Sequence, residues 1–182
     1  MQALAQSLTT TENARAAGSA CIKIDMQQNY FELFQLPVSF DVDTDDLAQR
    51  HRAVIARVHP DQFANKSAME QRVALQWATF ANEAFDTLKS PLTRAQYLLK
   101  LNAPELAAEG ARVNLPHEFL MQQMMWREAM EEGALDSVRE EVTQLQAETL
   151  AQLGDECARM DWDAVAVTLA KCQFVENFMG QL

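Results

Sequence analysis

The stretch that decides the fold is DDLAQRHRAVIARVHPD, residues 45–61. Its helical part places apolar side chains and one histidine at the spacing of a single helix face, namely Leu47, His51, Val54 and Val58. Acidic residues open this helix, and either Thr44 or Asp45 is expected to be its N-cap. Because a proline disfavours the helical conformation in the residue before it, Pro60 predicts that the helix ends at a loop containing His59-Pro60-Asp61.

A second amphipathic helix is predicted on the other side of this loop, over residues 69–89. Its apolar residues recur every three or four positions, at Val73, Trp77, Phe80, Ala84 and Leu88. Ser90-Pro91 ends that helix, and a shorter one over residues 92–101 follows with the proline near its first turn. The two long helices can therefore lie antiparallel, with His59-Pro60-Asp61 in the loop that joins them.

Four segments of this region carry a family resemblance. They are YFELFQLP at residues 30–37, HPDQF at 59–63, FANEAFDTL at 80–88 and SPLTRAQYLL at 90–99. In this order they resemble the J-domain of J-protein co-chaperones and, more narrowly, the HscB-type co-chaperone of iron–sulfur cluster assembly, a resemblance that extends through the second half of the chain. Some eukaryotic relatives carry an N-terminal cysteine-pair module, which a lone Cys21 cannot reproduce, so the resemblance favours the bacterial form.

The fold class expected from these features is all-α. Five Gly and five Pro in 182 residues, with little period-two alternation, argue against sheets. We expect residues 1–29 to be a disordered extension or an over-long gene start, 30–101 a J-domain, 102–115 a linker and 116–182 a C-terminal client-binding domain. Helices predicted over 116–132, 135–160 and 162–181 have short connections, which implies an antiparallel three-helix bundle.

The negative charge is concentrated in the second half of the chain. The net charge is −11, and residues 102–182 contribute 15 acidic and 5 basic side chains to it. A surface of this sign repels phosphate backbones, so nucleic acid is not expected as a partner, whereas a client with basic residues is. No run approaches the roughly eighteen apolar residues of a membrane-spanning helix. We therefore expect a cytoplasmic protein without a membrane partner.

Side chains suited to chemistry are few. Cys21, Cys157 and Cys172 form no C-x-x-C pair and are expected to be inert thiols. For His59-Pro60-Asp61 the residue types allow catalysis, metal binding or docking to a partner. No further nucleophile or carboxylate pair lies at supporting spacing, so docking is favoured and we expect no enzyme, cofactor or metal site. His51 is expected to be partly buried and His117 to lie on the surface.

The predicted helix over residues 116–132 has two apolar faces. At about 100° per residue, Phe119, Trp126 and Met130 lie on one side. The other side carries Leu120, Met121, Met124, Met125, Glu128 and Glu132. An edge helix of a three-helix bundle buries only one face, so the second is expected to be exposed for a partner. The alternative is that it packs against the rest of the protein.

The last helix shows a similar pattern. Val165, Leu169 and Cys172 lie on one stripe, while Phe174 and Phe178 lie near the opposite side. This distribution predicts a second spare apolar face.

The resemblance implies two protein partners. An HscA-type chaperone ATPase would engage His59, Pro60 and Asp61 and be stimulated to hydrolyse ATP. Arg50 and Arg57 share a helix face and would steer this docking, unless they are simply solvated charges. An IscU-type iron–sulfur scaffold would bind Leu120, Met121, Met124, Glu128, Glu132 and Phe174. Met125 replaces an acid usual in the family, which makes the client contact more apolar. The alternative function is that of a J-domain co-chaperone for a different client.

Overall fold

A computed structural model describes residues 29–108 and 113–182, and every regular element in these ranges is a helix. The all-α prediction is confirmed. The elements are α1 (Tyr30–Leu33), α2 (Thr44–Val58), the 3-10 helix η1 (Pro60–Phe63), α3 (Ala68–Lys89), α4 (Pro91–Asn102), α5 (His117–Glu131), α6 (Leu135–Arg159) and α7 (Trp162–Met179). The expectations for residues 1–28, Cys21 included, lie outside the described residues.

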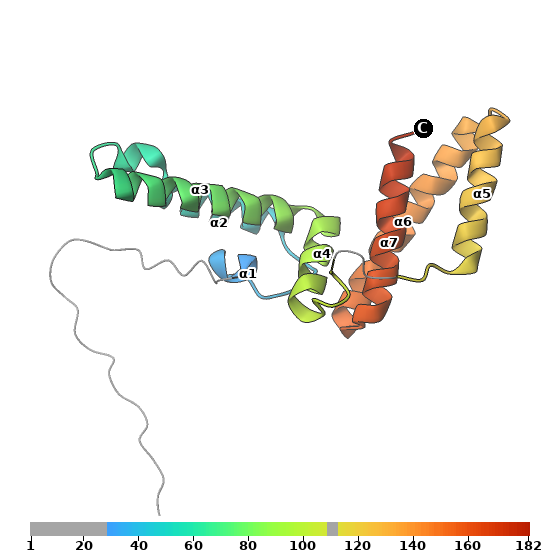
Figure 1. Cartoon of the computed structure of the whole chain (residues 1–182), viewed down its shortest axis with the longest axis horizontal. Helices are drawn as coiled ribbons and strands as arrows, with labels where there is room; N and C mark the ends of the chain where they lie inside the picture. The colour runs from blue at the N-terminus through green and yellow to red at the C-terminus, as the bar shows by residue number, and fades with distance from the viewer. Residues whose placement is uncertain (1–28, 109–112) are drawn as a thin grey trace, which may run out of the picture.

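Helices α2 and α3 lie side by side as the predicted hairpin (Figure 1). The side chain of Asp43 caps α2, because its Oδ1 accepts hydrogen bonds from the backbone N–H groups of Asp45 and Asp46 at 2.8 and 3.2 Å. The prediction that Thr44 or Asp45 is the cap is therefore wrong, since both already belong to the helix. Ser67 and Glu70 form a capping box at the start of α3.

The short helix α1 closes the open side of this hairpin. Phe31 and Phe34 are buried against Leu47 of α2 and against Ala84 and Leu88 of α3. A helix of four residues is not stable alone, so the burial of Phe31 and Phe34 is what holds α1 in place.

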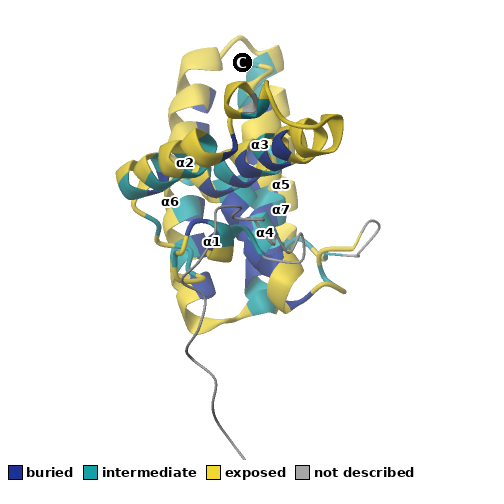
Figure 2. Ribbon diagram, turned by 90° about the vertical axis from the view of Figure 1, so that its left-hand side faces the viewer, coloured by how far each residue is buried: buried dark blue, intermediate teal, exposed yellow. Residues whose placement is uncertain are grey.

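Helix α4 carries the same apolar core into the C-terminal half of the chain. Its buried face, formed by Ala95, Leu98 and Leu99, belongs to one cluster that also includes Leu153 of α6 and Leu169 of α7. Figure 2 shows the buried residues gathered around α4 and α7. The core is therefore continuous from the hairpin to the bundle, and the domain boundaries expected at residues 102–115 stay a prediction.

A second apolar cluster lies at the far end of the bundle, where α5 packs on α6 and α7. Phe119 and Trp126 of α5 meet Val138 and Val142 of α6 and the end of α7 there. Gly133, with a φ of 86°, and Met160, with a φ of 57°, are the left-handed residues of the two bundle turns. Figure 1 shows α5, α6 and α7 as neighbouring rods.

The expected spare apolar face on the last helix is wrong. Helix α7 is covered by α6 along its length, by α4 on its N-terminal half and by α5 near its end. Val165, Leu169 and Cys172 are buried on one side, and Phe178 is buried on the other, stacked on Trp126 with ring centroids 5.4 Å apart. The apolar residues on both sides of α7 are therefore covered by neighbouring helices, whereas polar residues such as Asp163, Glu176 and Asn177 are exposed.

The guanidinium of Arg94 joins three segments of the chain. The side chain is buried, and its Nε donates to the carbonyl oxygen of Leu88 at 2.7 Å and its Nη2 to that of Lys89 at 3.2 Å. Its Nη1 donates to the carbonyl of Phe40, in the connection between α1 and α2. Burial lowers the pKa of Arg94, although a guanidinium stays charged throughout the physiological range. This arginine therefore fixes α4 against the end of α3 and the α1–α2 connection.

We predict that Arg94→Ala lowers the free energy of unfolding by about 3 kcal/mol or more, because three carbonyl oxygens in buried or partly buried surroundings lose a charged donor. Chemical denaturation followed by circular dichroism measures the change. Lys100→Ala, an exposed position on the same helix, is the control and should shift stability by about 0.5 kcal/mol at most. Equal stability of the two variants would contradict the conclusion that Arg94 fixes α4 against the end of α3 and the α1–α2 connection.

Candidate functional site

His59-Pro60-Asp61 lies at the tip of the α2–α3 hairpin. His59 ends α2 and caps η1, where its Nδ1 accepts a hydrogen bond from the backbone N–H of Asp61 at 3.3 Å. The same nitrogen lies 3.4 Å from Oδ2 of Asp61. Pro60 occupies the first position of η1, which suits its fixed φ. The His59 side chain is half exposed and that of Asp61 almost wholly so, which leaves both accessible to a partner.

Two glutamines hold the tip in place. Nε2 of Gln62 donates to the carbonyl of Ala56 in α2 at 2.7 Å. Nε2 of Gln71, in the first turn of α3, donates to the carbonyls of Ala64 and Lys66 at 3.1 Å each. Sequence reasoning missed both residues, since glutamine at these positions carries no periodic signal. The tip is thus preorganised by side-chain bonds to its own backbone.

The two arginines of α2 have different surroundings. Nε of Arg50 pairs with Oδ2 of Asp46 at 2.9 Å, and its Nη1 donates to the carbonyl oxygens of Phe34 and Gln35 at 3.0 and 2.9 Å. Arg50 thereby secures the end of α1, where Gln35 adopts a left-handed φ of 54°. Arg57 is exposed and forms no ion pair with any described residue. Of the two, Arg57 has the more available charge.

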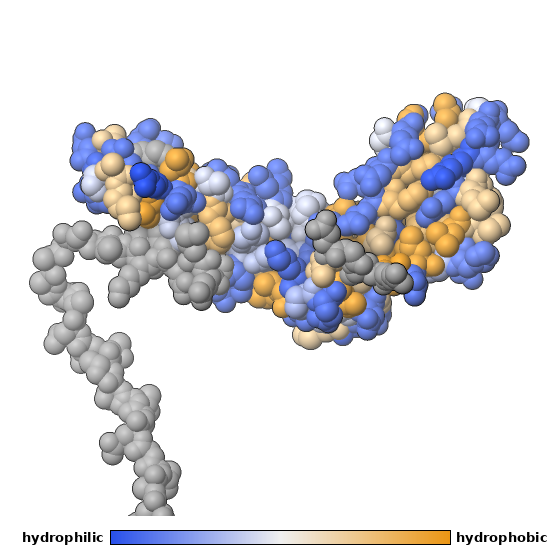
Figure 3. Space-filling model, viewed as in Figure 1, coloured by the Kyte–Doolittle hydropathy of each residue, from blue (hydrophilic) through white to orange (hydrophobic). Residues whose placement is uncertain are grey.

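The second predicted surface lies on α5 and is exposed as the sequence predicts. The exposed fractions are 43% for Leu120, 45% for Met121, 64% for Met124 and 62% for Met125. Glu128 and Glu132 are exposed on the same side, whereas Phe119 and Trp126 are buried on the other. Figure 3 shows apolar residues on the arm that α5, α6 and α7 form. The six exposed side chains, which we call the α5 face, form an apolar strip with two carboxylates at one end.

Phe174 differs from the other residues predicted for this surface. It is only partly exposed and belongs to the second apolar cluster. Its ring meets Phe119 edge-on at 5.6 Å and stacks on Phe178 at 5.7 Å between centroids. Phe174 therefore supports the buried side of α5, and it presents only part of its ring to a partner.

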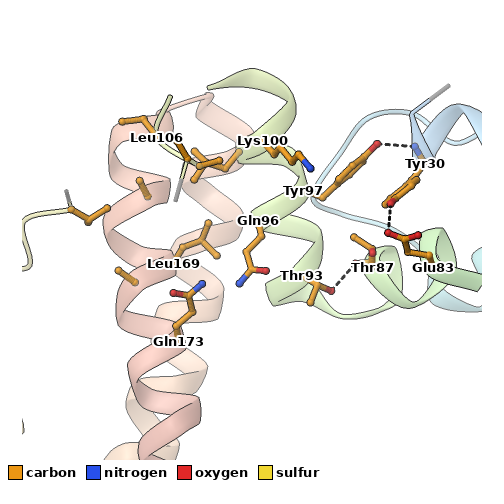
Figure 4. A pocket seen from close by; sticks show the side chains of 16 residues that line it. Tyr30, Glu83, Thr87, Thr93, Gln96, Tyr97, Lys100, Leu106, Leu169 and Gln173 are labelled. Atoms are coloured by element: carbon orange, nitrogen blue, oxygen red, sulfur yellow. Dashed lines mark hydrogen bonds between the residues drawn. The ribbon is translucent and has the colours of Figure 1, made fainter. Parts of the chain in front are cut away.

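The hairpin tip and the α5 face lie at opposite ends of the molecule (Figure 1). The part between them contains a cleft of about 580 Å³ where α3, α4 and α7 meet. In Figure 4 the hydroxyl of Tyr30 donates to Oε1 of Glu83 at 2.9 Å, and the backbone N–H of Tyr30 donates to the hydroxyl oxygen of Tyr97 at 2.9 Å. Burial, with Glu83 adding to it, raises the pKa of Tyr30 to about 12. These hydrogen bonds hold α1 against α3 and α4.

The other histidines and the cysteines of the described residues form no further site. His51 is partly buried, hydrogen-bonded through Nε2 to Asn82 at 2.9 Å and stacked on Phe85, and His117 is exposed, both as predicted. Cys157 and Cys172 are buried free thiols. Across residues 29–108 and 113–182, no group of three or more His, Cys, Asp or Glu side chains could hold a metal ion. None of the described helices is long and apolar enough to cross a bilayer.

Sequence comparison relates this chain to one family. Residues 115–182 match the family described as the HSCB C-terminal oligomerisation domain. The co-chaperone protein HscB homolog of Burkholderia thailandensis is 39% identical over 166 residues, which cover 87% of this chain and 94% of the relative. That of Vibrio cholerae is 40% identical over 162 residues, with coverage of 85% and 94%.

Structure comparison gives the same family. The chaperone HscB from Vibrio cholerae superposes with a TM-score of 0.71 at 38% identity, covering 85% of this chain and 94% of the other. Human co-chaperone protein HscB superposes with a TM-score of 0.77 at 27% identity, covering 87% and 82%. The arrangement of hairpin, joint and bundle is thus shared with both proteins.

We predict different effects of truncation at Leu120 and Phe174. Leu120→Ala should change the free energy of unfolding by about 0.5 kcal/mol at most, because the side chain lies on the exposed face. Phe174→Ala should lower it by about 2 kcal/mol, because two aromatic contacts of the second cluster are lost. Urea unfolding of the two variants measures both values. A stable Phe174→Ala variant would mean that this ring belongs to the exposed surface.

Proposed function

The chain belongs to the HscB family of co-chaperones, and from this premise we propose that it stimulates the ATPase of an HscA-type chaperone and delivers to it an IscU-type iron–sulfur scaffold protein. Delivery of the scaffold would aid the maturation of iron–sulfur proteins. As a co-chaperone the protein is not itself an enzyme. The observation that carries the proposal is the pair of exposed surfaces, the hairpin tip and the α5 face, at opposite ends of a molecule with a continuous core.

The chaperone would dock at the hairpin tip. The ring of His59 and the carboxylate of Asp61 are exposed on a preorganised turn, so little ordering is needed on binding. Arg57 would steer an acidic chaperone surface toward this end, and Arg50 would add its positive charge while it holds α1. All chemistry on ATP would take place in the chaperone.

The scaffold would dock on the α5 face. Leu120, Met121, Met124 and Met125 offer adaptable apolar area, since methionine side chains are flexible and polarizable. Glu128 and Glu132 would pair with basic residues of the client, in keeping with the net −10 of residues 102–182. Phe174 would contribute mainly indirectly, because its ring packs against Phe119 on the buried side of α5.

Holding both partners on one protein raises the effective concentration of the scaffold at the chaperone. The benefit depends on the joint between the two ends, and here α4 shares its core with α6 and α7. A rigid connection keeps the two docking surfaces in one fixed relation.

We predict that His59→Gln abolishes stimulation of the chaperone ATPase and leaves the fold intact, because the half-exposed ring belongs to neither apolar cluster and its one local bond, to the Asp61 N–H, lies in the exposed tip. Steady-state ATP hydrolysis by the chaperone, with and without the co-chaperone, measures the effect. His117→Gln removes an exposed imidazole at the start of α5 and is the matched control, with normal stimulation expected. Normal stimulation by His59→Gln would refute the docking assignment.

We predict that Leu120→Ala combined with Met124→Ala weakens scaffold binding at least tenfold, as truncation of central anchors typically costs about 2 kcal/mol each. The melting temperature should stay unchanged, since both side chains are exposed. Met160→Ala removes a methionine that is 72% exposed at the other bundle turn, and this variant should bind normally. Isothermal titration calorimetry with the purified scaffold gives the affinities. If the unmodified chain does not bind the scaffold, the α5 face serves a different client.

A further inference from the structure

We propose that Met121, Met124 and Met125 form an oxidation-sensitive site, at which conversion of the three thioethers to sulfoxides releases the client from the α5 face. The inference rests on the proposed function, because it concerns the same surface. It adds a chemical modification that would control when the surface binds.

The exposed sulfur of the described residues is concentrated on this helix. Five methionines are exposed in the described residues, and three of them lie within five residues on the same side of α5. The other two, Met69 at the start of α3 and Met160 after α6, lie far from the α5 face along the chain and provide internal controls.

The thiols of Cys157 and Cys172 should react with an oxidant less readily than the exposed methionine thioethers. Peroxides react with thiolates, and burial raises the pKa of Cys157 to about 11, with Glu156 nearby adding to the effect. Burial also raises the pKa of Cys172, and both side chains are almost fully covered. A thioether needs no deprotonation, so exposure alone decides its reactivity. Exposed thioethers are therefore the accessible sulfur groups of the described chain.

The reaction with hydrogen peroxide balances without a further reagent. A lone pair of Sδ attacks one peroxide oxygen, the O–O bond breaks and an S–O bond forms. The departing hydroxide takes the proton of the transferred oxygen and leaves as water. The sulfur loses two electrons and the peroxide gains them, giving one sulfoxide and one water for each methionine.

The product suits release of a client. Oxidation converts a flexible apolar side chain into a polar one, and Glu128 and Glu132 on the α5 face cannot donate a hydrogen bond to the new oxygen, although the exposed Arg127 can. A client that covers the oxidised side chains would lose apolar contacts and would have to remove water from the new sulfoxide oxygens. The helix itself should persist, because Phe119 and Trp126 anchor it from the buried side.

The test uses the full chain with Cys21→Ser, so that the cysteine outside the described residues does not contribute. The protein is treated with hydrogen peroxide and desalted before the scaffold is added, so that the scaffold itself is not exposed to the oxidant. Peptide mass spectrometry locates the sulfoxides, and calorimetry compares each protein with its own untreated form. We expect the treated chain to bind the scaffold at least tenfold more weakly, and methionine sulfoxide reductases to restore its binding.

Two sets of leucine variants assign the effect. In M121L/M124L/M125L, treated and untreated protein should bind with affinities within about twofold of each other, whatever the untreated affinity is. In M69L/M160L, peroxide should still cause the full loss. Leucine conserves volume and helix propensity, and reversal by the reductases tests the same point without any variant.

Several outcomes would overturn the inference. One is unchanged scaffold binding by a chain with sulfoxides mapped at all three positions. Another is an equal loss in M121L/M124L/M125L, or protection by M69L/M160L. Absence of scaffold binding before treatment would instead refute the proposed function, and the inference with it.

Discussion

The hydrogen bonds of the Arg94 guanidinium are the constraint on which the rest of the architecture depends. One buried cation collects carbonyl oxygens from the end of α3 and from the α1–α2 connection, while its own helix, α4, supplies core residues to both halves. A buried guanidinium is tolerated only when its donors are satisfied, so the three backbone segments must keep one arrangement. This gives a physical reason for the arginine in the stretch SPLTRAQYLL at residues 90–99. Tyr97, in the same stretch, adds a bond to the first residue of α1.

The two proposed docking surfaces are built in contrasting ways. At the hairpin tip a few polar groups are held by bonds to the local backbone, through His59, Gln62 and Gln71. On α5 the surface side chains have no such restraint, and rigidity comes from the buried aromatic residues on the opposite side of the helix. The first design favours a partner of fixed shape, and the second favours a partner to which the surface must adapt.

Periodicity was sufficient to predict the helices and the exposed side of α5, because a helix at the edge of a bundle carries its burial pattern in its own sequence. It failed at α7, where neighbouring helices cover both apolar sides, because sequence alone does not distinguish a covered apolar face from a free one. The helical pattern predicts an exposed face that includes Phe178, whereas the structure buries this residue. The bonds of Arg50 to α1 and the cap by Asp43 were also missed, since each depends on the backbone path of a neighbouring segment. The continuous core through α4 could not be predicted, because it depends on how two helical units meet.

The placement of the two surfaces at opposite ends has a mechanical consequence. The hairpin is joined to α6 and α7 by the core that passes through α4, and α5 is joined to them by the second apolar cluster, so the described molecule behaves as a spacer of set length. Two proteins docked at the two ends would not touch across its length unless one of them extends along its side. The distance between the two docking surfaces would therefore determine how far the chaperone or the client must extend for the two to make contact.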